Sequence, residues 1–224
     1  MGLSGGMDSA TLLSHLLEQG YEVHCCSFVY GSKHNKYENQ SARNIVAYYH
    51  LDGMAGHAVK HYEFDLTEIL GNLNSALLAS DNRDIPEGHY AAETMRQTVV
   101  PGRNLLFAST MASLAESIRA SKVALGVHSG DHFIYPDCRN EFVKSLDTTV
   151  FLSSDKQLEV IAPFRDLDKT EILKIGYNCH PVTPYHLTRT CYKKQEKSCG
   201  KCGSCRERLE AFHNIGKQDP IDYE

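Results

Sequence analysis

The sequence predicts an α/β protein with a doubly wound, mostly parallel sheet, flanking helices, and a helical C-terminal region that carries a cysteine cluster. Apolar, β-rich runs alternate with helical patterns as far as residue 130. This alternation is typical of βα units joined by right-handed crossovers. Glycine-rich or polar segments follow the strand runs, at the place where parallel sheets bind their ligands. Four of the eight cysteines lie within residues 191–205.

The first predicted elements surround a glycine turn near the amino end. The turn over 4–9 leads into a helix over 10–19, with Gly20 as its C-terminal cap. The mostly apolar run 21–30 predicts a strand that is covered on both faces. After it, the pattern predicts a helix over 38–51, a strand over 61–66, and a helix with Ile69, Leu70, Leu73 and Leu77 on one face. Only three residues precede the turn, so the strand that feeds it is either very short or begins before the sequence given.

A long polar loop over 80–102 separates these elements from the second part of the chain. The pattern then predicts a helix over 103–120, whose apolar stripe we expect to pack in the core, and a buried strand over 122–128. Residues 168–176 predict a helix with a capping box, because an aspartate stands three residues before a glutamate at its start.

The 224 residues allow one large domain, or one domain with an appendage. We expect an α/β domain over 1–165 and a helical region over 166–224, packed together as one unit. No apolar run approaches the roughly 20 residues that a membrane-spanning helix needs. The net charge of −5 argues against direct nucleic-acid binding outside a local patch. Clustered cysteines in an otherwise cored α/β chain favour a reducing cytoplasm.

The segment SGGMDS, residues 4–9, has the features of an anion-binding loop. Gly5 and Gly6 let the backbone approach a ligand closely, and Ser4 and Ser9 add hydroxyl groups. The helix that follows directs its positive end at the same place. Asp8 fits such a site if it holds a magnesium ion or caps the helix. The segment is neither a Walker A loop nor a G-x-G-x-x-G motif, and a simple Gly-Gly turn is the alternative.

The C-terminal cysteines have the spacing Cys-x7-Cys-x2-Cys-x2-Cys, which indicates a metal site. Four thiolates suit a tetrahedral zinc ion, and a site without an open position is structural. An iron–sulfur cluster and free thiols are the alternatives, although the ferredoxin spacing with its proline is absent. The lysines and arginines around the cluster either neutralise the thiolates or contact nucleic acid. The expected metal ligands are Cys191, Cys199, Cys202 and Cys205.

Two further polar segments stand next to predicted elements. Arg103 and Asn104 open the helix over 103–120. The second segment directly follows the strand over 122–128, where a polar cluster favours a binding site over a solvated loop. It contains Asp131, Tyr135, Asp137 and Arg139. Cys138 in the same segment is either a nucleophile or a small buried residue.

In this context SGGMDS resembles the pyrophosphate loop of the N-type ATP pyrophosphatases (the PP-loop superfamily), which cleave ATP between its α- and β-phosphates. Further stretches, in order from residue 4 to about residue 212, resemble the 7-cyano-7-deazaguanine synthase family within that superfamily. These stretches are SGGMDS, SFVYGSKH, VPGRNLLF, GVHSGDHFIYPDCRNEF, APFRDLDKTEI, and LTRTCY with CGKCGSC. The sequence departs from the family pattern at Val29, where Asp is usual, and at Arg189, where Trp is common.

The resemblance implies a fold similar to that of the adenine nucleotide alpha-hydrolases, and carbon–nitrogen ligase activity. Its substrates would be 7-carboxy-7-deazaguanine, ATP and ammonia, with Mg²⁺ and a structural Zn²⁺ as cofactors. The substrate carboxylate would attack the α-phosphate of ATP, and ammonia would displace AMP to give the amide. A second ATP would activate the amide, which then becomes the nitrile. The resemblance also implies a homodimer.

The resemblance assigns roles to residues of this chain. The nucleotide would be bound by Ser4, Gly5, Gly6, Asp8, Ser9, Tyr30 and Gly31. Catalysis would depend on Asp8, Ser9, Arg103 and Lys169, although Arg103 and Lys169 also fit a helix-terminus charge and a solvated first-turn lysine. The deazaguanine would be bound by Asp131, Tyr135, Asp137 and Arg139. Aspartates suit the donor edge of the base, and a tyrosine suits stacking on its ring.

Three other functions fit parts of the sequence. A related ligase could stop at the amide, or use another amine or substrate, and the mass of the product would distinguish it. A PP-loop enzyme that modifies tRNA would need a catalytic thiol pair and a basic surface. A zinc-knuckle module that binds nucleic acid would leave the SGGMDS loop idle, and ATP-dependent release of pyrophosphate would exclude it.

Overall fold

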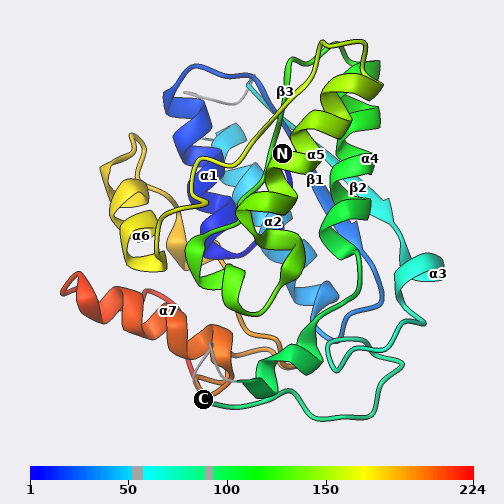
Figure 1. Cartoon of the computed structure of the whole chain (residues 1–224). Coiled ribbons are helices and arrows are strands. Elements are labelled where there is room, and N and C mark those ends of the chain that lie inside the picture. The colour runs from blue at the N-terminus through cyan, green and yellow to red at the C-terminus, as the bar shows by residue number, and fades with distance from the viewer. Residues whose placement is uncertain (52–57, 89–92) are drawn as a thin grey trace.

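Two parallel strand pairs form the centre of the fold in the computed structural model, which describes residues 1–51, 58–88 and 93–224 (Figure 1). Strand β1 (Val23–Val29) pairs with β2 (Val59–Asp65), and β3 (Lys122–Ala124) pairs with β4 (Glu159–Ile161). Most of β1 is buried, which confirms the expectation that both of its faces are covered. The parallel pairing confirms the predicted α/β class.

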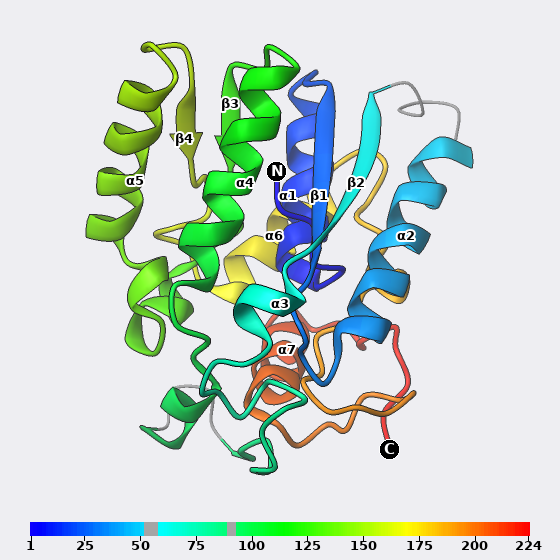
Figure 2. The ribbon, with the colours of Figure 1, turned by 90° about the vertical axis from the view of Figure 1, so that its right-hand side faces the viewer.

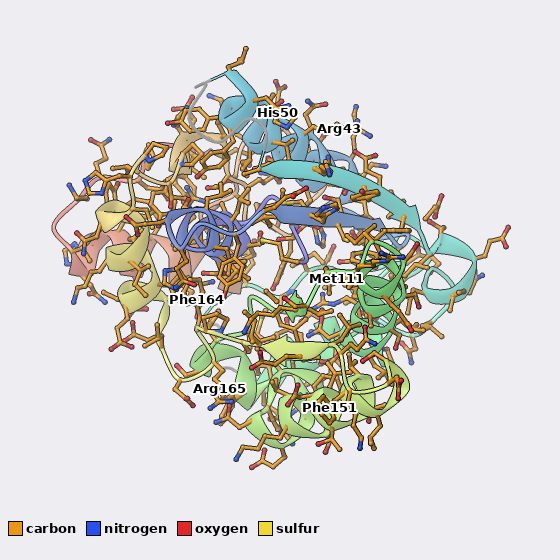
Figure 3. All side chains as sticks on the ribbon, turned by 90° about the horizontal axis from the view of Figure 1, so that it is seen from above. Arg43, His50, Met111, Phe151, Phe164 and Arg165 are labelled. Atoms are coloured by element: carbon orange, nitrogen blue, oxygen red, sulfur yellow. The ribbon has the colours of Figure 1, made fainter. Side chains whose placement is uncertain are left out.

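Helices flank the strands on both sides. Viewed from above, α1 and α6 lie on one side of the strands and α4 lies on the other (Figure 3). Figure 2 shows α5 and α2 at the two outer edges and α7 below the strands. Among the residues that the structure describes, no helix combines the length and apolar character needed to cross a membrane. The helices are α1 (Met7–Glu18), α2 (Asn35–Leu51), α3 (Thr67–Leu70), α4 (Arg103–Ser117), α5 (Asn140–Ser153), α6 (Lys169–Asn178) and α7 (Gly203–Asn214).

The first three residues extend the strand pair β1–β2. Gly2 forms a parallel bridge with Cys26, and the Leu3 N–H donates to the Cys26 carbonyl at 2.8 Å. The Cys26 N–H in turn donates to the Met1 carbonyl at 2.8 Å. A short extended segment beside β1 therefore feeds the glycine turn, as a strand does in a βα unit.

The helix after β2 and the strand β3 are much shorter than the sequence predicts. The helix expected after β2 is the single turn α3, because it ends at Gly71 and the residues beyond it include two asparagines, which favour turns. Leu70 and Leu77 are nonetheless buried. Strand β3 ends at Ala124 rather than at residue 128, and the chain beyond it forms a cavity wall.

Helix α6 confirms the predicted capping box and extends past its predicted end. The Glu171 N–H donates to the Asp168 carboxylate at 2.8 Å, and the Glu171 carboxylate accepts from the Asp168 N–H at 2.8 Å. Gly176 lies inside the helix and does not cap it. Its lack of a side chain allows close packing instead. A Cβ at Gly176 would overlap the Tyr185 hydroxyl.

A buried arginine on α7 forms an ion pair with the segment after that helix and hydrogen bonds with the segment before the cysteine cluster. The Arg208 side chain is fully buried, and its Nε donates to the Asp219 carboxylate at 2.7 Å. Its other nitrogens donate to the Thr188 hydroxyl at 2.7 Å and the Tyr185 carbonyl at 3.2 Å. Removal of one member of such a pair costs about 3–5 kcal/mol, because the other charge stays buried. The domain boundary at residue 165 stays a prediction.

Candidate active site

A cavity of about 230 Å³ lies where β1 and β3 end and α1 and α4 begin. Tyr30 directly follows β1, and the segment 125–128 follows β3. The cavity is therefore at the carboxyl ends of parallel strands, as expected for a ligand site in this class of fold. Of the residues with expected roles, Ser4, Gly6, Asp8, Ser9, Tyr30, Arg103, Asp131, Tyr135 and Lys169 line it.

The SGGMDS loop is held in shape by its own hydroxyl groups. The Ser4 and Ser9 hydroxyls are 3.1 Å apart, and the Ser9 hydroxyl donates to the Gly6 carbonyl at 3.1 Å. The Ser4 N–H and the Gly6 N–H donate back to these hydroxyls, each at 3.2 Å. Gly6 is the N-cap of α1, so the backbone N–H groups at the start of that helix lie beside the cavity. This arrangement suits a phosphate group.

Gly5 supports the loop from behind, although it does not line the cavity. Its φ is +84°, and a Cβ there would lie 2.9 Å from the Ala42 nitrogen and would overlap the Glu38 carbonyl oxygen. Gly31 plays a similar part, because its φ is +79° and a Cβ would lie 2.9 Å from the Gly71 Cα. These two glycines allow the backbone to pack closely beside the site.

A glycine-to-alanine pair tests this packing. We expect Gly5→Ala to lower the free energy of unfolding by about 3 kcal/mol, because it combines a left-handed φ with a backbone overlap. Gly20→Ala is the matched control: its φ is +82°, but nothing lies within 4 Å of its Cβ position. The control should lose only about 1 kcal/mol. Urea unfolding curves measure both, and equal losses would show that the α2 contact does not matter.

Asp8 and Lys169 face each other across the loop. The Lys169 Nζ lies 3.2 Å from Asp8 Oδ2 and 2.6 Å from Glu207 Oε2. Burial alone would lower the pKa of the Lys169 ammonium, but the carboxylates of Asp8 and Glu207 raise it well above its usual value. Lys169 is therefore a permanent positive charge and not a base. It is 6% exposed, which excludes the solvated-lysine alternative.

The other oxygen of Asp8 has the property expected of a ligand to a cation. Asp8 Oδ1 is buried and has no hydrogen-bond partner among the described residues. A carboxylate oxygen buried without a partner is costly, and a magnesium ion accepts carboxylate oxygens in sites that also hold phosphates. The residues present thus fit Mg²⁺ at Asp8.

Arg103 begins α4 and carries a second positive charge to the cavity. Its guanidinium carbon lies 5.8 Å from the centre of the Tyr135 ring. Burial opposes its charge, but the neighbouring Tyr30 hydroxyl and Asp137 carboxyl raise the pKa of Arg103 well above its usual value. Two fixed cations, Arg103 and Lys169, therefore border the same space as the helix end.

The segment after β3 divides into residues inside and behind the cavity. Asp131 and Tyr135 line it, and the Tyr135 hydroxyl hydrogen-bonds to the Thr98 hydroxyl at 2.9 Å. Asp137 does not line the cavity; its carboxylate accepts the Asn104 N–H at 2.9 Å and so fixes the start of α4. Arg139 does not line it either, is exposed, and donates to the His132 carbonyl at 3.1 Å.

Cys138 lines the cavity as a buried thiol. Burial, with a smaller contribution from Asp131, raises its pKa well above the usual range. A thiol with a raised pKa has little thiolate and is a poor nucleophile at neutral pH. The geometry thus favours the interpretation of Cys138 as a small packing residue.

An apolar wall faces these polar groups, and part of it comes from residues that the sequence pattern assigns to the core. The Phe28 and Phe107 rings stack with centroids 4.0 Å apart, and the Tyr30 ring meets Phe107 edge-on at 5.6 Å. Phe107 and Met111 come from the α4 stripe expected to pack in the core, and both also line the cavity. A flat aromatic ligand would fit such a wall.

Several further polar residues belong to the site, although the sequence alone assigned them no role. Their neighbours in the sequence gave a signal for His34 in SFVYGSKH, for His128 in GVHSGDHFIYPDCRNEF, for Arg189 in LTRTCY, and for Asn104 beside Arg103. Glu38 and Glu207 lie on helices whose neighbours in the site are mostly distant in sequence, and no periodicity marks them. The additional residues are His34, Glu38, Asn39, Asn104, His128 and Arg189 in the cavity wall, and Glu207 behind Lys169.

Arg189, which stands where the resembled family has Trp, is 7% exposed and lies above the Tyr37 ring, 4.4 Å from its centre. Its nitrogens donate to the Glu196 carbonyl at 2.7 Å and the Gln195 carbonyl at 2.5 Å. The planar guanidinium stacks as an aromatic side chain would, and it also shapes the loop before the last three cysteines.

The four C-terminal cysteines converge as predicted. All are buried, and the Sγ atoms of Cys191, Cys199, Cys202 and Cys205 lie within 4.8 Å of one another. Tetrahedral zinc with bonds of about 2.3 Å places its sulfurs about 3.8 Å apart, and the Cys199 and Cys205 sulfurs are 3.9 Å apart. Backbone N–H groups of Lys193 and Cys199 donate to Cys191 Sγ, each at 3.4 Å. This cluster fits a zinc ion.

Comparison with known proteins agrees with this geometry. The family model described as "Queuosine biosynthesis protein QueC" matches residues 1–216. A 7-cyano-7-deazaguanine synthase from Caldicellulosiruptor saccharolyticus is 45% identical over 222 residues, which cover 99% of this chain and 93% of the relative. Proteins of the same name from Pseudoalteromonas atlantica and Methanoregula boonei are each 44% identical, over 99% of this chain and 96% and 97% of the relatives. The chain belongs to the QueC family.

Proposed function

We propose that this protein is an ATP-dependent carbon–nitrogen ligase that converts 7-carboxy-7-deazaguanine and ammonia into 7-cyano-7-deazaguanine. One observation carries the proposal: a single cavity joins the SGGMDS loop, the cations Lys169 and Arg103, and the segment after β3. Its family membership and the name of its relatives support the same activity.

The first step in this proposal is adenylation of the substrate carboxylate. The carboxylate attacks the α-phosphorus of ATP, and the bond to the bridging oxygen breaks as pyrophosphate leaves. The N–H groups at the start of α1 and the hydroxyls of Ser4 and Ser9 hold the departing phosphates. Lys169 and Arg103 offset the negative charge that develops, and electrostatic stabilisation of this kind typically contributes more to catalysis than any other single effect.

The deazaguanine binds on the other side of the cavity. Asp131 accepts hydrogen bonds from the donor edge of the base, and Tyr135 contacts its ring. Asp137 and Arg139, which do not line the cavity, position this segment against α4 and the preceding turn. Tyr30 and Phe107 form a wall for the adenine of ATP.

The two metal ions have separate tasks in the proposal. Asp8 would hold the Mg²⁺, which neutralises charge on the phosphates, and the four cysteines would hold a structural Zn²⁺. Ammonia displaces AMP from the adenylate to give the amide, and a second ATP activates the amide for conversion to the nitrile. We further propose that the protein is cytoplasmic and forms a homodimer. Light scattering on the purified protein would test the dimer.

Mass spectrometry tests the activity directly. The protein is incubated with ATP, Mg²⁺, an ammonium salt and 7-carboxy-7-deazaguanine, and the products are identified by mass. We expect the nitrile together with AMP and pyrophosphate. The amide alone would indicate a ligase that stops one step earlier, and the appearance of neither product would refute the proposal.

A further inference from the structure

The start of α2 places an imidazole and a carboxylate side by side in the cavity wall. The His34 side chain is 1% exposed, and its Nε2 lies 3.3 Å from Glu38 Oε2. The other ring nitrogen, Nδ1, is buried and has no hydrogen-bond partner among the residues that the structure describes. Both side chains line the same cavity as the SGGMDS loop. A buried, unsatisfied ring nitrogen in a ligand cavity needs an explanation.

The surrounding structure fixes this pair. Asn35 accepts hydrogen bonds from the Tyr30 N–H at 3.0 Å and the Ser32 N–H at 2.8 Å, which sets the turn from β1 into α2. Its side-chain amide donates to the Phe28 carbonyl at 3.0 Å. Gly5 packs directly against the Glu38 carbonyl, so this turn of α2 touches the pyrophosphate loop. The position of the pair relative to the loop is therefore rigid.

The charge of the pair suits a small cation. Besides burial, the Glu38 carboxylate raises the pKa of the neighbouring Tyr30, which shows that its negative charge reaches into the cavity. A carboxylate orienting an imidazole leaves the far ring nitrogen free to accept a proton, as in a catalytic triad. The proposed reaction needs such a group, because ammonium is protonated at neutral pH and only neutral ammonia is a nucleophile.

We propose that His34 and Glu38 form the ammonium site, with His34 Nδ1 binding the cation and removing its proton, and Glu38 orienting the ring through Nε2. This inference rests on the proposed function. With the ring proton on Nε2, His34 donates to Glu38 and keeps the Nδ1 lone pair free. One proton passes from ammonium to Nδ1, and the carboxylate of Glu38 stabilises the resulting imidazolium.

Ammonia then attacks the adenylate. The nitrogen lone pair of ammonia forms a bond to the acyl carbon of the adenylate. The bond from that carbon to the phosphate oxygen breaks, and its electron pair leaves with AMP. The second proton that the nitrogen loses goes to water. The products are the amide and AMP, and no oxidant or reductant is required.

Two nucleophiles separate this role from a structural one. Hydroxylamine is uncharged at neutral pH and needs no deprotonation before it attacks the adenylate. We expect His34→Asn and Glu38→Gln to lower kcat/KM for ammonium about 100-fold. With hydroxylamine, both variants should form the hydroxamate within about threefold of the wild-type rate. His180→Asn is the control, because His180 pairs with Glu18 on the surface and does not line the cavity.

Adenylation without any amine provides the second measurement. Exchange of labelled pyrophosphate into ATP, in the presence of 7-carboxy-7-deazaguanine, reports a folded and active loop, and both variants should keep it. Three results would overturn this inference without affecting the proposed function. The variants could lose pyrophosphate exchange, lose activity with ammonium and hydroxylamine equally, or keep the wild-type kcat and KM for ammonium. A wild-type protein without exchange would refute the proposed function and the inference with it.

Discussion

Lys169→Met is expected to lower the rate of adenylation about 100- to 1000-fold while KM for ATP changes much less. The charge of Lys169 lies 3.2 Å from Asp8 and is held between two carboxylates, so in the proposed mechanism it would act where the leaving pyrophosphate gains negative charge. Removing one preorganised group that stabilises a transition-state charge typically costs a factor of this size. Methionine keeps the length and the buried contacts of the side chain. Pyrophosphate release, followed in a coupled assay, measures the effect.

Lys174→Met is the matched control, because Lys174 is exposed on the same helix and faces away from the cavity wall. It should retain wild-type activity. Lys169→Met should also melt at a lower temperature, since Asp8 and Glu207 then lack their common partner. If Lys169→Met instead raised KM for ATP with kcat unchanged, Lys169 would serve ground-state binding only.

The second large effect is expected from the cysteine cluster. Cys202→Ser should abolish stoichiometric zinc binding and lower Tm by more than about 10 °C, because a structural zinc ion supplies folding free energy that this region otherwise lacks. The cluster is buried beside the main apolar core and fixes the start of α7. Elemental analysis and a thermal melt on the same preparation measure the two quantities.

Cys179→Ala is the control, because Cys179 is an equally buried thiol outside the cluster. It should keep its zinc and lose only a few degrees of Tm. Iron and a visible absorbance band in the wild-type protein would instead identify an iron–sulfur cluster. A wild-type protein that contains no metal, together with a Cys202→Ser variant of equal Tm, would refute the metal site.

Local patterns predicted the parts of the site that lie on one short stretch of chain. The SGGMDS loop, the Asp168 capping box and the cysteine spacing each hold their determinants within a few residues, and the structure contains each of them. The prediction that the ligand site lies at the carboxyl ends of the strands is also confirmed, because the cavity lies at the ends of β1 and β3. Parallel sheets leave little choice in where such segments meet.

Features that depend on distant neighbours were missed. Glu207 faces Lys169 only because α7 packs below α6, and nothing in the periodicity of either helix marks that contact. Phe107 and Met111 pack in or against the core, as predicted, but their part in the cavity wall was missed, because a hydrophobic stripe does not distinguish a cavity wall from a packed interior. The helix predicted after β2 is wrong beyond its first turn for a local reason. Its apolar spacing is helical, but Gly71 and the following residues favour a turn.

The Arg208–Asp219 pair links the segment around residue 219 to the wall of the proposed nucleotide site. Arg208 anchors the segment that runs from Tyr185 to the cavity-wall residues Arg189 and Thr190, and Asp219 is its counter-ion. A fusion partner or deletion that displaces Asp219 would thus release this wall and change nucleotide affinity without touching a single residue of the loop.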